Sequence, residues 1–291
     1  MDNWGKAGKI AAEALEYGSK LIKVNADVKE VCEKTEAKII ELGGKAAFPV
    51  QVSINEMAAH FTPQDEIIKF KENDVVKLDV GAHVEGHIGD NALTVDLGDN
   101  KDLVKASKLA LQEAIKLAKP GIKLFEIGEM IEKTITEYGF KPIRNLSGHG
   151  IGIYEEHSGF TIPNYNNDDN TKLEEGQIIA IEPFATDGIG LVKDGKLSRI
   201  YKVINVKQVR NDITRNVLKF ILQEYNTLPF AKRWLLKKLQ SFNVNFALRM
   251  LEKDNILHHY PQLTEKSNGL VSQHEFTLLV NDQPKILTKA D

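Results

Sequence analysis

The sequence predicts an α+β fold in which helices and antiparallel strands occupy separate stretches of the chain. Apolar residues recur with helical spacing over residues 7–22, 27–43, 102–118 and 124–139. Apolar stretches bounded by glycine, asparagine or proline predict strands over residues 75–82, 88–95 and 177–184. A helical block over residues 213–253 precedes a last strand over residues 270–280, so this block is predicted to be an insertion in the α+β domain.

The first four predicted helices form two related pairs. Asp27 is the expected N-cap of the second helix, and Gly43 is its expected end. One constant offset, which relates 28 to 124 and 43 to 139, aligns two sets of residues: Val28, Glu30, Val31, Ile39 and Gly43 with Leu124, Glu126, Ile127, Ile135 and Gly139. This match predicts a duplicated helix–helix–strand unit.

The strands over residues 75–82 and 88–95 are predicted to form a hairpin around Glu85-Gly86. With those two residues in the turn, Asp79 lies opposite Ala92 and Asp90 lies on the same face as Asp79. Diagonal neighbours in a hairpin are about 7–8 Å apart at the backbone, close enough for two carboxylates to share a cation. Taken alone, two solvent-facing aspartates are the more common explanation of such a pair.

Three further candidates for a polar site are isolated in the sequence. They are His149 in LSGHGIG, Glu182 in IAIEPFA and Glu275 in VSQHEFT. Glu182 lies in an apolar run, where a carboxylate is costly to bury unless it is paired or binds a cation. Strand alternation places Glu275 on one face with Gln273 and Thr277. The alternative for each of them is an exposed edge position.

Other conspicuous motifs are predicted to be structural. His83 and His87 belong to the hairpin tip and lack the order of an HExxH zinc motif. His258-His259 is predicted to be a surface turn, and Asp187-Gly188 and Asp194-Gly195 are predicted to be further turns.

Composition excludes several classes of protein. The 291 residues carry a net charge of −3, so no strong field favours nucleic acid or an anionic membrane. The single cysteine, Cys32, excludes an intrachain disulfide and fits a buried small apolar residue. The N-terminal segment has the pattern of an amphipathic helix, and no apolar run is long enough to span a bilayer. We infer a reducing, cytoplasmic location.

The candidate residues in combination resemble the dinuclear metal site of the methionine aminopeptidases. The matching ligands are Asp79 in KLDVG, Asp90 in IGDNALTV, His149, Glu182 and Glu275. The stretch AAFPVQVSINEMAAHFTP, which contains His60, also matches, and the resemblance covers nearly the whole chain. It implies the pita-bread fold, in which two similar α/β halves surround the metal site.

The helical block, which includes YNTLPFAKRWL, is similar to the insertion that separates type II from type I enzymes of this family. The chain lacks the long charged N-terminal extension of eukaryotic members and so resembles the short archaeal form. The implied division is a catalytic domain over residues 1–207, a helical insertion subdomain over residues 208–264, and the final catalytic strands over residues 265–291.

The resemblance implies that two divalent metal ions are the cofactors. Co, Mn, Fe and Zn all suit the oxygen-rich ligand set, and the sequence does not choose among them. Asp90 and Glu275 would bridge both ions, Asp79 would bind one, and His149 with Glu182 would bind the other. The ions would activate a bridging water for hydrolysis.

The resemblance also implies the roles of residues that act on the substrate. Glu182 would relay the proton of the water, while His60 and His157 would contact the scissile amide and steady the tetrahedral intermediate. Phe48, Phe184 and Tyr260 match positions that line the methionine pocket. The implied activity is hydrolysis of the initiator methionine from nascent proteins when the second residue is small.

The implied partner is the N-terminal peptide of a nascent protein, bound by a monomer. No specific nucleic acid or membrane is expected, and contact with the ribosome is left open. Two alternatives have the same fold. Prolidase or aminopeptidase P shares the ligand set but usually has an additional N-terminal domain, and non-enzymatic pita-bread proteins typically lose metal ligands.

One position departs from the family pattern. The family usually has an aromatic residue before its last glutamate and a histidine after it, whereas this chain has His274 before Glu275 and Phe276 after it. In an extended strand both neighbours face away from Glu275, so the exchange affects the opposite face of the strand. The role of the family's following histidine does not transfer to this chain.

Overall fold

A computed structural model of the chain describes residues 2–289. Its helices are α1 (Asn3–Leu21), α2 (Val28–Glu41), α3 (Lys101–Leu117), α4 (Leu124–Glu137), α5 (Asp212–Tyr225), α6 (Lys232–Leu236) and α7 (Ser241–Lys253). Its first eight strands are β1 (Lys45–Ala46), β2 (Gln51–Ile54), β3 (Met57–Ala59), β4 (Val75–Val84), β5 (His87–Asp96), β6 (Lys141–Pro142), β7 (Ser147–Gly152) and β8 (Glu155–Pro163). The remaining strands are β9 (Ile178–Ile181), β10 (Phe184–Thr186), β11 (Val192–Val203), β12 (Phe230–Ala231), β13 (Leu257–Glu265), β14 (Val271–Gln273), β15 (Glu275–Leu279) and β16 (Lys285–Ile286).

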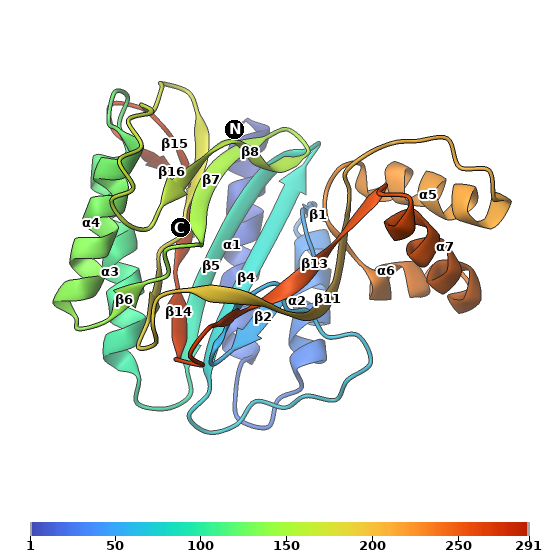
Figure 1. The fold of residues 1–291 in the computed structure, drawn as a ribbon, viewed down its shortest axis with the longest axis horizontal. Helices are drawn as coiled ribbons and strands as arrows, with labels where there is room; N and C mark the ends of the chain where they lie inside the picture. Colours follow the sequence, from blue (N-terminus) through green and yellow to red (C-terminus); the bar gives the residue numbers. More distant parts are fainter. Residues whose placement is uncertain (1, 290–291) are drawn as a thin grey trace.

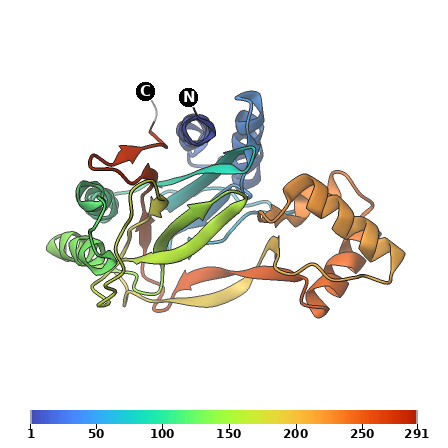
Figure 2. The ribbon, with the colours of Figure 1, turned by 90° about the horizontal axis from the view of Figure 1, so that it is seen from above.

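The largest sheet is antiparallel and has the strand order β1-β4-β5-β15-β9-β7-β8, with β2 paired to β4 and β16 paired to β15. Helix α1 packs beside β4 and β5, and α2 packs against α1 and near β1 and β2 (Figures 1 and 2). Helices α3 and α4 pack together near β14 and β8. The α+β fold class predicted from the sequence is confirmed. None of the helices among the described residues is both long and apolar enough to cross a membrane.

The duplicated unit is visible in the two helix pairs. Helices α2 and α4 each have 14 residues and keep the sequence offset at both ends. Asp27 caps α2 by accepting a hydrogen bond from the backbone N–H of Glu30, as predicted. Gly43 and Gly139, which follow the two helices, adopt the same left-handed conformation, with φ of 88° and 82°.

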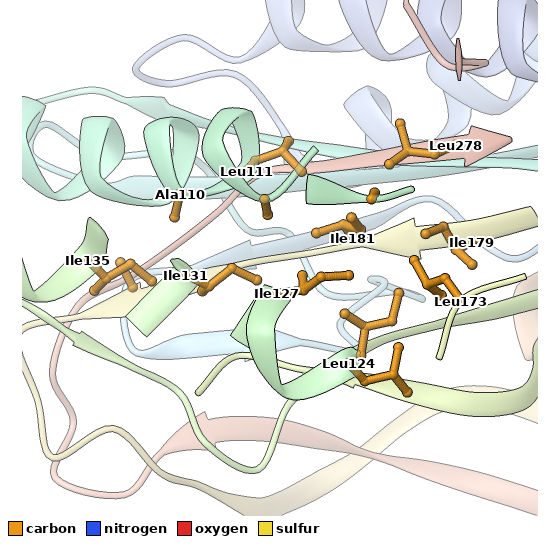
Figure 3. Close-up of a cluster of buried hydrophobic side chains, with 14 of the residues drawn as sticks. Ala110, Leu111, Leu124, Ile127, Ile131, Ile135, Leu173, Ile179, Ile181 and Leu278 are labelled. Atoms are coloured by element: carbon orange, nitrogen blue, oxygen red, sulfur yellow. The ribbon is translucent and has the colours of Figure 1, made fainter. Parts of the chain in front are cut away.

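Each helix pair buries its own apolar core against the sheet. One core joins α1 and α2 to β2 and β4 and contains Cys32, which is free and buried as predicted. The other core is shown in Figure 3, where Leu111 and Ile127 of α3 and α4 pack toward Ile181 and Leu278 of the sheet. Burial of apolar side chains at about 25 cal/mol per Å² makes these two cores the main source of stability.

The hairpin formed by β4 and β5 has the predicted register. Val84 pairs with His87, and Asp79 pairs with Ala92. The turn residues Glu85 and Gly86 both have positive φ, 50° and 81°, which two-residue hairpin turns of this kind require.

Two strands predicted as continuous are interrupted. The predicted strand over residues 177–184 is divided at Glu182-Pro183, because proline has no N–H to donate to the ladder; β9 belongs to the large sheet and β10 to a small one. The predicted strand over residues 270–280 is divided at His274: β14 belongs to the small sheet and β15 to the large one.

Two predicted turns are wrong. Asp194-Gly195 lies inside β11, where a register shift against β13 absorbs the glycine. His258-His259 lies inside β13, and the His259 ring stacks on Tyr201 at 4.0 Å between ring centroids. The pairing of β11 with β13 therefore outweighed the turn signals of these dipeptides.

Strands β11 and β13 form a long ribbon that leads from the sheets to the helical lobe of α5, α6 and α7 (Figure 1). The lobe has an apolar core of its own, which includes Leu218, Ile221, Leu235 and Leu248. The predicted division at residues 208 and 264 stays a prediction; the three helices lie within it, and β13 continues to Glu265.

Candidate active site

A cavity of about 360 Å³ lies where the large sheet, the ribbon and the helical lobe meet. All of the site residues predicted from the sequence line it. These are Phe48, His60, Asp79, Asp90, His149, His157, Glu182, Phe184, Tyr260 and Glu275. The structure thus brings together residues from both ends and the middle of the chain.

The five predicted ligands come from adjacent strands of the large sheet and lie on one face. Asp79 of β4 is opposite Ala92, which in turn pairs with Glu275 of β15. Asp90 precedes Ala92 by two residues on β5, so it shares this face. His149 of β7 pairs with Ala180, and Glu182 follows Ala180 by two residues immediately after β9. Strand alternation and register therefore direct all five side chains to the same side of the sheet.

The distances within this group suit a shared cation. The Nε2 atom of His149 is 3.8 Å from Oδ2 of Asp90 and 3.7 Å from Oε1 of Glu182. Ligand atoms of Asp90, His149 and Glu275 all lie within 4.8 Å of one another. Two ligands that each bind an ion at about 2 Å are at most about 4 Å apart. The group can therefore hold a divalent metal ion with small adjustments of the side chains.

The four buried carboxylates of the group also favour a bound cation. Burial raises the pKa of Asp79 to about 7, and burial followed by the charges of the other carboxylates raises the pKa of Asp90, Glu182 and Glu275 well above their ordinary values. The Oδ1 atoms of Asp79 and Asp90 are buried and have no hydrogen-bond partner among the described residues. A bound cation would stabilise all four ionised carboxylates and provide partners for these two oxygens.

Gln273 and Thr277 support the ligands and were not predicted as site residues. Gln273 Nε2 donates to Oε2 of Glu182 at 3.2 Å and is 3.4 Å from Oε2 of Glu275. The Thr277 hydroxyl accepts from the backbone N–H of Asp90 and donates to its carbonyl, both at 2.8 Å. The sequence did indicate that Gln273 and Thr277 lie near the ligands, because strand alternation places both on the same face as Glu275. Such supporting contacts orient ligands before a metal binds.

Glu156 is a further cavity residue that sequence reasoning missed. Its buried carboxylate accepts from Lys202 Nζ at 2.9 Å and from the Tyr260 hydroxyl at 3.3 Å. This contact joins β8, β11 and β13 beside the cavity. No sequence pattern relates residues so far apart, so only the folded chain reveals the cluster.

His60 is held in a fixed orientation. Its backbone has the strained φ of 64°, and its N–H donates to Oε1 of Gln51 at 2.7 Å. Its Nδ1 lies 3.2 Å from the carbonyl of Pro261, and because a carbonyl can only accept, Nδ1 carries the proton. Burial lowers the pKa of His60 to about 4, so the ring is neutral at pH 7 and Nε2 is an acceptor.

The remaining predicted residues form the wall of the cavity. The exposed His157 ring lies edge-on to His149, with 4.4 Å between ring centroids, and Tyr260 lies edge-on to His60 at 5.1 Å. Phe48 and Phe184 are buried. The Phe48 ring lies on Gly81, where an added Cβ would come within 2.2 Å of Phe48 Cε1. Only glycine at this position lets the ring approach the strand of Asp79.

The residues that flank Glu275 face away from the cavity, as predicted. His274 Nδ1 is 2.9 Å from the hydroxyl of Ser107 on α3, and Phe276 packs against the apolar core of α3 and α4. The departure from the family pattern therefore alters the contact with α3.

We expect a metal ion to raise the thermal stability more at pH 7 than at pH 5. Asp79 has an ordinary pKa of 3.8 and a pKa of about 7 in the metal-free fold, so its stabilising proton is fully present below about pH 4 and is lost as pH rises through about 7. A metal replaces that proton, and its contribution therefore grows over this range. Thermal unfolding with and without Mn²⁺ at both pH values measures the difference. An equal increment at both would contradict the assignment.

Comparison with known proteins identifies the family of this chain. The model of metallopeptidase family M24 matches residues 2–213. A methionine aminopeptidase of Archaeoglobus fulgidus is 48% identical over 284 residues, which are 97% of this chain and 96% of that protein. The crystal structure of a methionine aminopeptidase from Thermotoga maritima has a TM-score of 0.72 and 27% identity, and covers 98% of this chain and 94% of that chain. A structure described as a thermophilic Arx1 has a TM-score of 0.86 at 17% identity over 99% of this chain and 90% of that chain, which is a likeness of fold alone.

These likenesses confirm the pita-bread fold and the resemblance stated from the sequence. The family match spans more than half of the chain and includes four of the five predicted ligands, all except Glu275. The archaeal relative extends over nearly all of it. This chain belongs to metallopeptidase family M24 and, within it, to the methionine aminopeptidases.

Proposed function

We propose that this chain hydrolyses the N-terminal methionine of nascent proteins whose second residue is small, and that it does so as a monomer in the cytoplasm. The observation that carries the proposal is the single cavity in which the row of carboxylates and His149 meets the aromatic wall of Phe48, Phe184 and Tyr260. An aminopeptidase that uses metal needs its metal centre next to a side-chain pocket, because the scissile amide lies directly beside the N-terminal side chain.

The proposed cofactors are two divalent ions, and Co, Mn, Fe and Zn all suit the donors. We assign Asp90 and Glu275 as bridges, Asp79 to one ion, and His149 with Glu182 to the other. The unpartnered oxygens of Asp79 and Asp90 and the mutual approach of Asp90, His149 and Glu275 support a cation site at these residues, and the division between two ions follows the family resemblance. When bound, the ions would lower the pKa of a water and polarise the scissile carbonyl.

Glu182 is the proposed proton carrier of the reaction. Gln273 holds its Oε2, while its Oε1 lies toward His149. Its carboxylate therefore lies beside the proposed metal site, where it would take up a proton from the attacking water and pass it to the departing amine.

His60 and His157 are proposed to act on the peptide. The neutral His60 ring offers Nε2 as an acceptor for the N–H of the scissile amide, because Pro261 fixes the proton on Nδ1. His157, at the mouth of the cavity beside His149, is positioned to donate to the oxygen of the tetrahedral intermediate.

The aromatic wall accounts for the choice of methionine. A thioether packs favourably against aromatic rings, and its unbranched chain fits between buried Phe48 and Phe184 better than a β-branched side chain does. Tyr260 closes the cavity from the ribbon that leads to the helical lobe. The second residue of the substrate would lie against this side, which favours a small side chain.

Replacing His60 by alanine is expected to lower kcat by about 10²–10³, the usual contribution of one stabilising contact at the reacting amide. Metal content, measured by elemental analysis, is expected to stay at the wild-type value, because His60 is oriented by the carbonyl of Pro261 and is not one of the proposed ligands. His157→Ala is expected to behave in the same way. A parallel loss of metal in either variant would instead make that histidine a ligand.

The function is tested with peptides that begin with Met-Ala and with peptides that begin with X-Pro, assayed with added Mn²⁺ or Co²⁺. Release of methionine from the first peptide, with little cleavage of the second, is the expected result. Preferential cleavage before proline would make the chain a prolidase-like enzyme. No cleavage of either peptide by metal-loaded protein would favour a binding protein.

A further inference from the structure

The helical lobe is attached to the catalytic body through a buried ion pair between α2 and α6. Arg233 Nη1 donates to Oε2 of Glu36 at 2.6 Å, and Nη2 donates to Oε1 of Glu36 and to the Thr62 hydroxyl. Trp234 Nε1 also donates to Oε2 of Glu36, at 3.0 Å. Glu36 is 8% exposed and Arg233 is 4% exposed, so the pair is removed from solvent.

A buried ion pair by itself is a weak source of stability, because desolvation of the two charges offsets their attraction. An apolar pair of similar volume at the same positions would hold the lobe equally well. The additional hydrogen bonds of Glu36 therefore indicate what the pair does beyond attachment.

One of these hydrogen bonds leads to the proposed methionine pocket. Glu36 Oε1 accepts from the backbone N–H of Val50 at 3.2 Å. Val50 follows Phe48 by two residues, and the Phe48 ring lies on Gly81 beside the carboxylate row. The carboxylate of Glu36 thereby restrains the segment that carries one wall of the cavity.

The other side of the ion pair leads to a second wall of the cavity, at Pro229. Arg233 lies four residues after Pro229, which lines the cavity. The intervening strand β12 pairs with β11, and Leu228 is buried in the same apolar cluster as Phe48. The Thr227 hydroxyl fixes the start of this segment by donating to the carbonyl of Tyr154 at 2.5 Å.

We propose that Glu36 is a positioning residue for substrate selection: it holds the Phe48 wall and the Pro229 wall at one separation and thereby sets the fit of the methionine side chain. The inference rests on the proposed function, because it needs the cavity to bind methionine. It assigns to the helical lobe a specific part in the pocket, transmitted through one carboxylate with partners on both walls.

Two double variants distinguish the positioning of the cavity walls by Glu36 from the attachment of the helical lobe by the ion pair. Both Glu36→Gln/Arg233→Met and Glu36→Met/Arg233→Met remove the charged pair, but only the second removes the acceptor of the Val50 N–H. The partly exposed pair of Lys237 Nζ and Glu33 Oε1, 2.8 Å apart, joins the same α2 to the segment that follows α6. Glu33→Gln is therefore the matched control.

We expect Glu36→Met/Arg233→Met to raise KM for a Met-Ala-Ser peptide about tenfold, with less discrimination against an N-terminal leucine and with kcat nearly unchanged. The Val50 amide should exchange hydrogen faster in this variant. Glu36→Gln/Arg233→Met keeps the acceptor of the Val50 N–H but loses the Arg233 contact, so it should keep the wild-type exchange rate and raise KM less. Glu33→Gln should keep both the wild-type KM and the wild-type exchange rate.

Equal KM values in the two double variants, or a fall in kcat with wild-type KM, would overturn the proposal. If Glu36→Met/Arg233→Met does not fold, Glu36→Asp replaces it, because the shorter carboxylate keeps the charge but withdraws from Val50; a wild-type KM in that variant would also overturn the proposal. A wild-type protein that cleaves no methionyl peptide contradicts the proposed function, a result distinct from any of these.

Discussion

Replacement of Glu275 or Asp90 by alanine is expected to reduce the turnover of a Met-Ala peptide by at least about a thousandfold. Glu275 occupies the middle strand of the ligand row, and Asp90 lies beside it on β5. Each is the proposed bridge between two ions, so each substitution removes a ligand of both. The measurement is kcat/KM at saturating Mn²⁺, together with metal content by elemental analysis.

Both variants are expected to fold, because each substitution removes a carboxylate whose burial is unfavourable without a metal ion, as its raised pKa indicates. The metal-free variants should therefore melt no lower than the metal-free wild type. Asp99→Ala is the control, since the Asp99 side chain is 92% exposed and distant from the row. Near-normal turnover in the Glu275 or Asp90 variant would show that these carboxylates are not the metal bridges.

Peptides beginning with Met-Ala, Met-Gly or Met-Ser are expected to be cleaved about a hundredfold faster than those beginning with Met-Lys, Met-Leu or Met-Phe. The reason is steric: Tyr260 closes the side of the cavity where the second residue would lie, and a mismatch of one methylene group in such a pocket costs about 10–200-fold. A panel of peptides that differ only at the second position measures kcat/KM directly.

Tyr260 supplies the matching variant for this experiment. Its ring contacts His60, and its hydroxyl donates to Glu156, so it forms a fixed wall. Tyr260→Ala should narrow the difference between Met-Ala and Met-Phe peptides by admitting the larger side chain. Equal rates for the two peptides in the wild type, or faster release of another N-terminal residue, would contradict the pocket assignment.

The pattern of residues within one segment was sufficient to predict the features that depend on residues close together in the sequence. The Glu85-Gly86 turn determines the register of the β4–β5 hairpin, and this register alone places Asp79 and Asp90 on one face. Helix spacing and the cap at Asp27 were likewise sufficient for α2. Alternation would also have identified Gln273 as a neighbour of Glu275.

Contacts between distant segments could not be predicted in this way. No periodicity relates Asp90 to Glu275, and only resemblance to a family joined them before the fold was known. The interruptions at Pro183 and His274 depend on a strand passing from one sheet to another, which the apolar pattern of a single segment does not reveal. The pairing of Glu36 with Arg233 across 197 residues likewise has no local signal.

The central claim is that the row of carboxylates with His149 holds divalent metal that the reaction requires. Its most direct test is a titration of metal-free protein with Mn²⁺ or Co²⁺ while free methionine released from a Met-Ala-Ser peptide is measured. We expect no release of methionine before metal is added, and a rate of release that rises to a plateau at about two equivalents of metal per chain. Full release by protein that elemental analysis shows to be free of metal would contradict it.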